Sequence, residues 1–370
     1  MRIDCIDIYR VAMPLIYPFR TAFGDTHVVE SVLVKMRSGD LVGWGEAAPW
    51  ESPTYSEEWA AGAYILIRDW LAPRLLNQEV ESGEALQTRL AEFKGNRFAK
   101  AALDLAWWDL HARRSGSPLW KILGGSSGTV LVGADFGVME TIDALLDVID
   151  SAIKAGYKRV KLKFRPGWDL DMVRAVRGAF PACVFHVDCN SAYRLKDQRI
   201  FEELDGYGLA MIEQPLASDD LLDHAKLQRK IQTPICLDES IVSPEKASKA
   251  INIGAARWFN IKPGRVGGLT PALQVIQIAE RAGIPCWVGG MLESGLGASH
   301  CLALATLSNI KYPSDVFPSS RFFEKDLACP ELTLSGPSQM RAAEDAGIGC
   351  SPDEELLASR SVQRCQIRNL

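Results

Sequence analysis

The sequence predicts an α/β fold, an eight-stranded parallel barrel of the TIM type joined to a smaller α+β domain. Charged residues recur at intervals of 25, 25, 25 and 24 positions: Lys163, Asp188, Glu213, Asp238 and Lys262. Each follows a short apolar run that is typical of a buried strand. About 25 residues is the length of one strand plus one helix. In such a barrel the carboxyl ends of the strands share one rim, where active sites lie.

The first domain is expected over residues 1–125. Residues 1–55 alternate as an antiparallel meander does, and helical spacing covers 56–76 and 84–114. The pair Gly124-Gly125 marks a boundary before the barrel.

A segment inside the meander breaks its alternation. Residues Ile16–Gly24 are rich in Pro, Gly and aromatic side chains and follow neither a strand nor a helix period. We therefore expect an irregular loop there that acts as a mobile lid.

The barrel is expected over residues 126–320, and residues 321–370 should return to pack against the first domain. The predicted strands are 130–136, 159–164, 183–188, 208–213, 234–238, 256–261, 285–289 and 314–317. The intervening helices include 142–155, 170–179, 244–253 and 271–282.

Composition narrows the function classes. The chain has 370 residues, 47% of them hydrophobic, and a net charge of −5 with Lys and Arg scattered, so we expect no nucleic-acid or membrane surface. No apolar run approaches the length of about 18 residues that a membrane span needs, so we expect a soluble cytoplasmic protein. The nine cysteines include no Cys-x-x-Cys pair and are expected to be reduced.

Three of the recurring residues predict a metal site. Asp188, Glu213 and Asp238 would end neighbouring strands, where converging carboxylates repel one another unless a cation neutralises them. Ligation by oxygen alone favours Mg²⁺, with Mn²⁺ as the substitute, over Zn²⁺. Asn190, two residues after Asp188, is a candidate outer partner of this site.

The lysines predict proton transfer. Lys163 and Lys262 would stand across the barrel mouth from each other, one on each face of a chelated acid. Lys161 shares the inward direction of Lys163, and its charge is expected to lower the pKa of Lys163 toward that of a working base. The reaction that needs these parts is removal of a proton α to a carboxylate. Reprotonation from the other face gives racemisation, and loss of a β leaving group gives elimination.

Other polar residues have structural interpretations that compete with functional ones. His186 is expected to be a hydrogen-bonded core histidine rather than a ligand. Glu46 reads equally well as a site residue or as a structural group at a strand end. Glu239 points opposite to Asp238, toward an outer group or toward none.

The motifs around these residues resemble those of the enolase superfamily, muconate-lactonising-enzyme subgroup. The matching motifs are Lys161-x-Lys163, Asp188-x-Asn190, Glu213-Gln214-Pro215, Asp238-Glu239-Ser240 and Lys262, together with residues 101–110 and 118–125 outside the barrel. Within the subgroup, residues 18–24, 165–169, 262–268 and 289–297 resemble those of o-succinylbenzoate synthases and N-succinylamino acid racemases.

The resemblance implies a (β/α)7β barrel with a capping domain built from the N-terminal segment and the C-terminal tail. It implies that Lys163 removes the α-proton and that Lys262 stabilises the enediolate or acts as the second acid/base. The implied substrate-binding residues are Phe19, Phe23, Asn190, Met291 and Ser294. Outside the reacting groups it implies roles for Glu239 and for Arg265, an arginine associated with racemase activity.

The leading expectation is a Mg²⁺-dependent synthase that dehydrates 2-succinyl-6-hydroxy-2,4-cyclohexadiene-1-carboxylate to o-succinylbenzoate for menaquinone synthesis. The alternative is N-succinylamino acid racemase, alone or alongside the synthase. A dipeptide epimerase is less favoured because residues 312–316 lack its Asp-x-Asp motif. A catalytically idle binding barrel is the alternative from another class. The expected partner is a small carboxylate, and the oligomeric state stays open.

Overall fold

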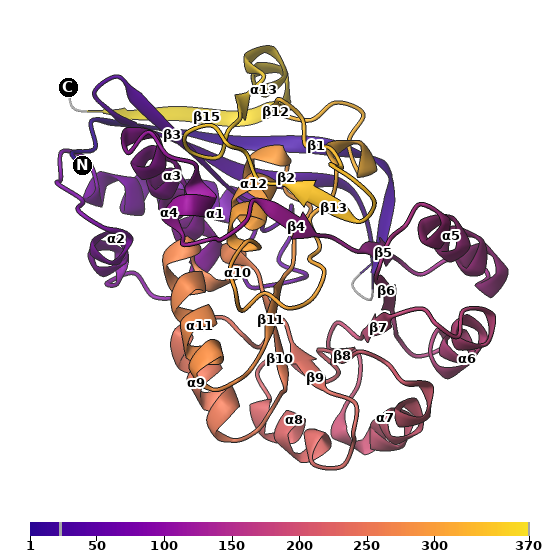
Figure 1. Ribbon diagram of the computed structural model, residues 1–370. Coiled ribbons are helices and arrows are strands. Elements are labelled where there is room, and N and C mark those ends of the chain that lie inside the picture. Colours follow the sequence, from indigo (N-terminus) through magenta and orange to yellow (C-terminus); the bar gives the residue numbers. More distant parts are fainter. Residues whose placement is uncertain (22–23, 369–370) are drawn as a thin grey trace.

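The computed structural model describes residues 1–21 and 24–368, and it places a capping domain over one end of a barrel (Figure 1). The capping sheet is antiparallel, in the order β15-β1-β2-β3. Its strands are β1 (Cys5–Thr21), β2 (Gly24–Ser38), β3 (Leu41–Ala47) and β15 (Ser361–Arg368). Because β15 pairs along β1, the end of the chain completes the sheet that its beginning starts.

The capping helices are α1 (Ala60–Leu66), followed by a π turn and a 3₁₀ turn through Arg74, then α2 (Gly83–Leu90), α3 (Arg97–Arg114) and α4 (Leu119–Ile122). Helix α3 packs closely on β3. A Cβ at Gly43 would come within 2.3 Å of the Ala106 carbonyl oxygen, so only glycine fits there. The expected helical stretch 84–114 is thus two helices, separated at 91–96.

The expected loop at Ile16–Gly24 is a correction. Its described residues through Thr21 are strand, because β1 and β2 form one long hairpin in which Phe19 pairs with Thr26 and Arg20 with Asp25. The pairing register shifts between Pro14 and Phe19, a stretch that includes Pro18. This shift explains why the alternation of the sequence is broken there. Phe23 lies outside the described residues.

The barrel is a parallel sheet in the order β11-β10-β9-β8-β7-β6-β5. Its strands are β5 (Ala134–Phe136), β6 (Val160–Lys163), β7 (Phe185–Asp188), β8 (Ile212–Glu213), β9 (Ile235–Leu237), β10 (Trp258–Ile261) and β11 (Cys286–Val288). The connecting helices lie outside the strands (Figure 1): α5 (Ile142–Lys154), α6 (Leu170–Ala179), α7 (Gln198–Leu204), α8 (Leu221–Gln228), α9 (Pro244–Asn252), α10 (Pro263–Val266), α11 (Leu269–Arg281) and α12 (Gly295–Leu304). The α/β barrel and capping domain predicted from the sequence are confirmed.

Two predicted strands differ in detail. The first divides into β4 (Thr129–Leu131), which pairs with β13 (Gln339–Arg341), and β5, which joins the barrel. The eighth, at 314–317, forms an isolated bridge from Ser314 to Val132, and a second bridge, from Ile310 to Cys286, precedes it. The backbone N–H of Asp315 still donates to Val288, 2.8 Å away, so this segment closes the barrel through few hydrogen bonds.

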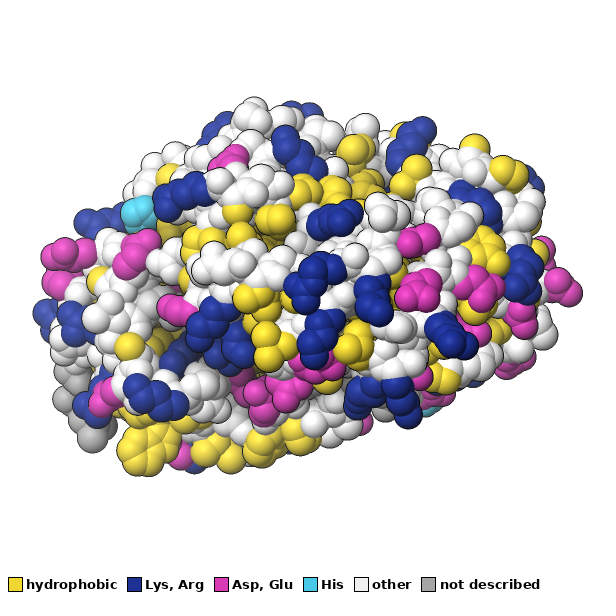
Figure 2. Space-filling view, turned by 90° about the horizontal axis from the view of Figure 1, so that it is seen from below, with side chains coloured by type: hydrophobic (Ala, Val, Ile, Leu, Met, Phe, Trp, Pro, Cys, Tyr) yellow, Lys and Arg dark blue, Asp and Glu magenta, His cyan; other side chains and the backbone are white. Residues whose placement is uncertain are grey.

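The segment after the barrel contains β12 (Ala328–Cys329), β14 (Ser351–Pro352) and α13 (Glu354–Arg360) before β15. No helix in the described ranges has both the length and the apolarity to cross a membrane. On the face seen in Figure 2, basic and acidic side chains are interspersed.

A layer of buried side chains fills the barrel beneath the charged rim. These residues stand two positions before each recurring charge: Lys161, His186, Met211, Cys236 and Asn260. Trp287 joins this layer, and its indole N–H donates to the Cys236 sulfur at 3.2 Å. Because strand side chains alternate, residues two positions apart point to the same side of the sheet. The period of about 25 residues that places the rim charges therefore places this buried layer as well.

Candidate active site

The register of the strands brings the recurring charges together. Lys163 pairs with Asp188, and Asp188 pairs with Glu213, at the ends of β6, β7 and β8. Asp238 and Lys262 directly follow β9 and β10. All five are buried on one rim.

The turns after these strands link one strand end to the next. Gln214, which follows Glu213, accepts hydrogen bonds through Oε1 from the backbone N–H groups of Asp238, at 2.9 Å, and Ser240, at 3.2 Å. Its backbone φ is 37°, and Asn190 after β7 has φ 42°, both in the left-handed region that non-glycine residues seldom adopt. The surrounding hydrogen bonds stabilise these strained backbone conformations, which lie at the rim of the candidate site.

Lys161 lies among three carboxylates. Its Nζ is 2.9 Å from Glu213 Oε2, 3.1 Å from Asp188 Oδ2 and 3.2 Å from Asp315 Oδ2. Lys163 Nζ donates to the same Asp188 oxygen at 2.8 Å. Buried ion pairs of this kind are fixed in position, because removing one partner leaves an uncompensated charge.

Lys262 lies in a second network. Its Nζ donates to Asp238 Oδ2 at 2.9 Å and to the Tyr55 hydroxyl at 3.0 Å. The Arg265 guanidinium bonds the other Asp238 oxygen and also donates to Tyr55 at 3.1 Å. Lys163 and Lys262 thus pair with different aspartates.

These contacts set the pKa values of the charged groups. Burial raises the pKa of Asp188, but Lys161 and Lys163 outweigh it, and the pKa lies well below its ordinary value. Burial likewise raises the pKa of Asp238, whereas Arg265 and Lys262 bring it below the ordinary value. Both carboxylates are therefore charged at neutral pH.

The expected low pKa of Lys163 is a correction. Burial lowers the pKa of this amine, but the Asp188 carboxylate raises it, and the net pKa lies above the ordinary value of a lysine. Lys161 lowers the pKa of Lys163, as predicted, but the effect of Asp188 is larger. Lys163 therefore becomes a base only when the charge of Asp188 is taken up by another cation.

The donor set fits a hard divalent cation, since three buried carboxylates stand on three adjacent strand ends. Their oxygens bond lysine and arginine here, and no three His, Cys, Asp or Glu side chains among the described residues are grouped so as to hold a metal ion. Lys161 lies between Asp188 and Glu213, and its ammonium group supplies part of the positive charge that these two carboxylates require. A metal bound by Asp188, Glu213 and Asp238 stays a prediction.

A cavity of about 40 Å³ opens between the two lysines. The predicted site residues that line it are Phe19, Lys161, Lys163, Asn190, Lys262 and Met291. The Phe19 ring of the capping hairpin lies 5.7 Å from Lys163 Nζ. This volume holds only a few water molecules, so a substrate must displace side chains to enter.

Ser294 and Glu46 have a structural role. Glu46 is 2% exposed and accepts hydrogen bonds from Ser31, from the Ser294 hydroxyl and from the backbone N–H groups of Ser294 and Gly297. Ser294 is the N-cap of α12. Glu46 therefore ties the capping domain to the start of a barrel helix, and the Ser294 side chain is engaged in that contact.

Two further sequence interpretations concern His186 and Glu239. His186 is fully buried between Glu213 Oε2, at 3.3 Å, and the Tyr312 hydroxyl, at 3.1 Å, as a core histidine would be. Glu239 accepts from the Asn190 amide at 3.1 Å, and burial raises its pKa to about 8. Its other oxygen, Oε2, is buried with no hydrogen-bond partner.

The sequence interpretation missed four residues that line the cavity: Trp50, Tyr55, Asp135 and Asp315. Asp135 follows Ala134 on β5, and its Oδ1 is buried without a hydrogen-bond partner. Asp315 pairs with Arg159 at 2.6 Å and with Lys161. Both acids lie in predicted strands, which was a usable signal, whereas no period marks Trp50 or Tyr55 in the 48–59 loop.

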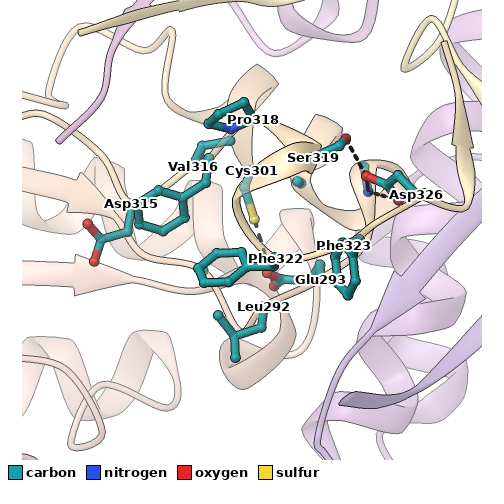
Figure 3. A pocket seen from close by; sticks show the side chains of 14 residues that line it. Leu292, Glu293, Cys301, Asp315, Val316, Pro318, Ser319, Phe322, Phe323 and Asp326 are labelled. Atoms are coloured by element: carbon teal, nitrogen blue, oxygen red, sulfur yellow. Dashed lines mark hydrogen bonds between the residues drawn. The ribbon is translucent and has the colours of Figure 1, made fainter. Parts of the chain in front are cut away.

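A smaller pocket of about 20 Å³, drawn in Figure 3, shares Gly290, Leu292 and Asp315 with the lining of the cavity. Phe322 lines this pocket together with Asp315 and with the hydrogen-bonded pair of Ser319 and Asp326 (Figure 3). Phe322 also packs edge-on against Phe19, with ring centroids 6.1 Å apart. The C-terminal segment thus supports the hairpin that covers the site.

These features define a class of protein: a capped α/β barrel whose rim joins three carboxylates and opposed lysines. The model of the mandelate racemase / muconate lactonizing enzyme N-terminal domain matches residues 5–124, and that of the enolase C-terminal domain-like family matches residues 144–356. The chain belongs to the enolase superfamily. Members of this superfamily generally use Mg²⁺.

Individual relatives cover nearly the whole chain. It is 44% identical over 349 residues to N-succinylamino acid racemase of Thermus thermophilus, which covers 94% of both chains. It is 42% identical over 354 residues to o-succinylbenzoate synthase of Geobacillus kaustophilus, covering 95% of this chain and 94% of the relative. A crystal structure of an enolase-superfamily member from Listeria innocua has a TM-score of 0.96 at 34% identity, covering 100% of this chain and 99% of the other.

Proposed function

We propose that this protein is a Mg²⁺-dependent o-succinylbenzoate synthase. The observation that carries the proposal is a single buried cavity with Lys163 and Lys262 in its wall, each paired with a carboxylate of one rim. That arrangement suits an acid whose α-carbon lies between two amines. The substrate itself is inferred from relatives such as the synthase of Geobacillus kaustophilus.

In this proposal Lys163 removes the proton α to the substrate carboxylate. Lys262, held by Asp238, contributes positive charge on the opposite face, where it stabilises the enediolate. Lys163 then returns the proton it removed to the β-hydroxyl, and the C–O bond breaks to release water. Asp188, Glu213 and Asp238 would hold Mg²⁺, which supplies further charge at the carboxylate oxygens when bound. Phe19 and Met291 exclude water from the cavity.

N-succinylamino acid racemase is the second candidate, and a specific observation favours it. Lys262 has hydrogen-bond partners that fix its direction, Asp238 and Tyr55, as a group that must deliver a proton to one atom requires. In racemisation the enediolate formed by one lysine is reprotonated by the other. The relative from Thermus thermophilus bears this name.

A parallel assay tests both candidates. Purified protein with Mg²⁺ is offered the cyclohexadiene carboxylate and an N-succinylamino acid, and kcat/KM is compared. A synthase converts the first substrate with the higher kcat/KM, and a racemase converts the second. Turnover of neither would leave the binding barrel as the surviving alternative and refute both candidates.

A further inference from the structure

Tyr55 comes from the capping domain, in the loop between β3 and α1, and reaches the barrel rim. Its ring forms part of the wall between two spaces, because it lines both the 40 Å³ inner cavity and an outer crevice of about 670 Å³. Trp50 holds this ring from the side, with centroids 5.5 Å apart, and its own N–H donates to the Met291 carbonyl at 2.9 Å.

The hydrogen bonds that the structure describes for the Tyr55 hydroxyl connect it to Lys262 and not to Lys163. The oxygen accepts from Lys262 Nζ at 3.0 Å and from the Arg265 guanidinium at 3.1 Å. Its own proton faces Asp238 Oδ2 at 3.5 Å, the oxygen that also accepts from Lys262. The ammonium of Lys262 is thus held between an oxygen of the barrel and an oxygen of the cap.

Lys163 is held differently. Among the residues that the structure describes, its hydrogen-bond acceptor is Asp188 of the adjacent barrel strand, and its contact with the cap is the Phe19 ring at 5.7 Å. A phenyl ring attracts an ammonium and has no acceptor atom that fixes its direction. The two lysines therefore depend unequally on hydrogen bonds from the capping domain.

We propose that Tyr55 is a positioning residue for Lys262, acting through its hydroxyl on the proton transfer at one face of the substrate and not at the other. This inference rests on the proposed function, in which the two lysines serve opposite faces. The capping domain then does more than exclude water, since it directs one of the two reacting amines.

Tyr55→Phe is the decisive variant, because it keeps the ring in the wall and removes only the hydroxyl. Both enantiomers of N-succinylphenylalanine are incubated in D2O with Mg²⁺, and α-proton exchange is followed by NMR. Lys262→Ala first identifies which enantiomer Lys262 serves. For that enantiomer we expect Tyr55→Phe to slow exchange about 10- to 100-fold, with change of less than about threefold for the other.

A double variant tests whether Tyr55 acts through Lys262. In a Lys262→Ala background, Tyr55→Phe should cause no further loss at the remaining enantiomer. Tyr9→Phe is the matched control, since it removes a phenol from the capping sheet beside Trp44. We expect it to leave both exchange rates unchanged.

Equal loss at both enantiomers, or loss at neither, would overturn the positioning role. Failure of the unaltered protein to exchange either enantiomer would instead refute the racemase chemistry. A crystal structure of Tyr55→Phe decides the inference in that case. The Lys262 amine should have left its place between Asp238 and the ring, and an unmoved amine would overturn the proposal.

Discussion

At the scale of single residues, the site is a balance of buried charges. Lys161, Lys163 and Lys262 offset the charges of Asp188, Glu213 and Asp238, and Arg159 offsets that of Asp315. Every lysine here contacts a carboxylate within 3.2 Å, so each amine is protonated until that carboxylate takes another partner. Two predictions belong at this scale.

The first prediction concerns the opposed lysines. In D2O, Lys163→Arg and Lys262→Arg should each retain α-proton exchange for at most one enantiomer of an N-succinylamino acid, and they should spare opposite enantiomers. NMR measures the exchange. If either variant exchanged both, the lysines would not face each other across the substrate.

The second prediction concerns the metal. EDTA should abolish turnover and added Mg²⁺ should restore it, because three buried carboxylates on adjacent strand ends are costly without a cation. Asp238→Asn should weaken Mg²⁺ binding in a calorimetric titration. Glu280→Gln, a change on α11, is the control and should leave binding unaltered. Full turnover by metal-free protein would contradict the site.

At the scale of elements, the β1–β2 hairpin links the cap to the cavity. Its end is anchored on the C-terminal segment, since the Ile16 N–H donates to the Phe322 carbonyl at 2.9 Å and the Tyr17 hydroxyl to the Arg321 carbonyl at 2.8 Å. Phe19 then reaches over Lys163. The hairpin must give way for a substrate to enter so small a cavity.

The third prediction follows from that cover. Phe19→Ala should raise KM and lower kcat of the active reaction by about tenfold, because water enters the site and the substrate is held less firmly. Steady-state kinetics measure both constants. Leu15→Ala, on the same strand, is the control for a general weakening of the hairpin. Unchanged constants in Phe19→Ala would make the hairpin only a connector.

At the scale of the whole molecule, carboxylates of the capping domain hold the starts of two barrel helices. Glu46 bonds the N-terminus of α12, and Asp104 on α3 accepts from the Thr270 N–H of α11 at 3.1 Å. The Gln87 amide bonds both Asp104, at 2.9 Å, and the Gly267 carbonyl, at 2.8 Å. Gly268 is required there, because it has φ 123° and an added Cβ would lie 2.3 Å from Asp104.

The fourth prediction is a pH dependence of stability. Burial raises the pKa of Asp104 from 3.8 to about 6, so the folded protein holds this proton more tightly than the unfolded chain does. The stability it contributes is present below about pH 4 and is lost as pH rises through about 6. The loss is on the order of 3 kcal/mol, from the size of the shift.

Asp104→Asn cannot titrate, so it isolates this contribution. Denaturant unfolding from pH 4 to pH 7 should show the unaltered protein losing stability relative to Asp104→Asn over that range. Asp171→Asn, on the exposed side of α6, should give no such difference. A difference that is constant with pH would mean that Asp104 is already charged at pH 4.

The sequence determined the barrel, the order of its strands and the rim residues. A period of about 25 residues encodes strand and helix length, and alternation places Lys161 beside Lys163, so local rules suffice. The predictions that were wrong concern segments whose structure depends on pairing with residues far away in the sequence. Residues Ile16–Thr21 are strand because the end of this segment pairs with β2, and the predicted eighth strand is reduced to an isolated bridge from Ser314 to Val132.

Only the tertiary structure decided the state of the charges and the contribution of the cap. The raised pKa of Lys163 depends on its 2.8 Å contact with Asp188, and Tyr55 meets Lys262 from 207 positions away in the chain. Electrostatic and hydrogen-bond energies depend on distances of a few ångströms between such groups, and sequence spacing carries that information only within a repeat. The residues of the reaction are therefore legible in the sequence, whereas their direction and protonation are set by packing.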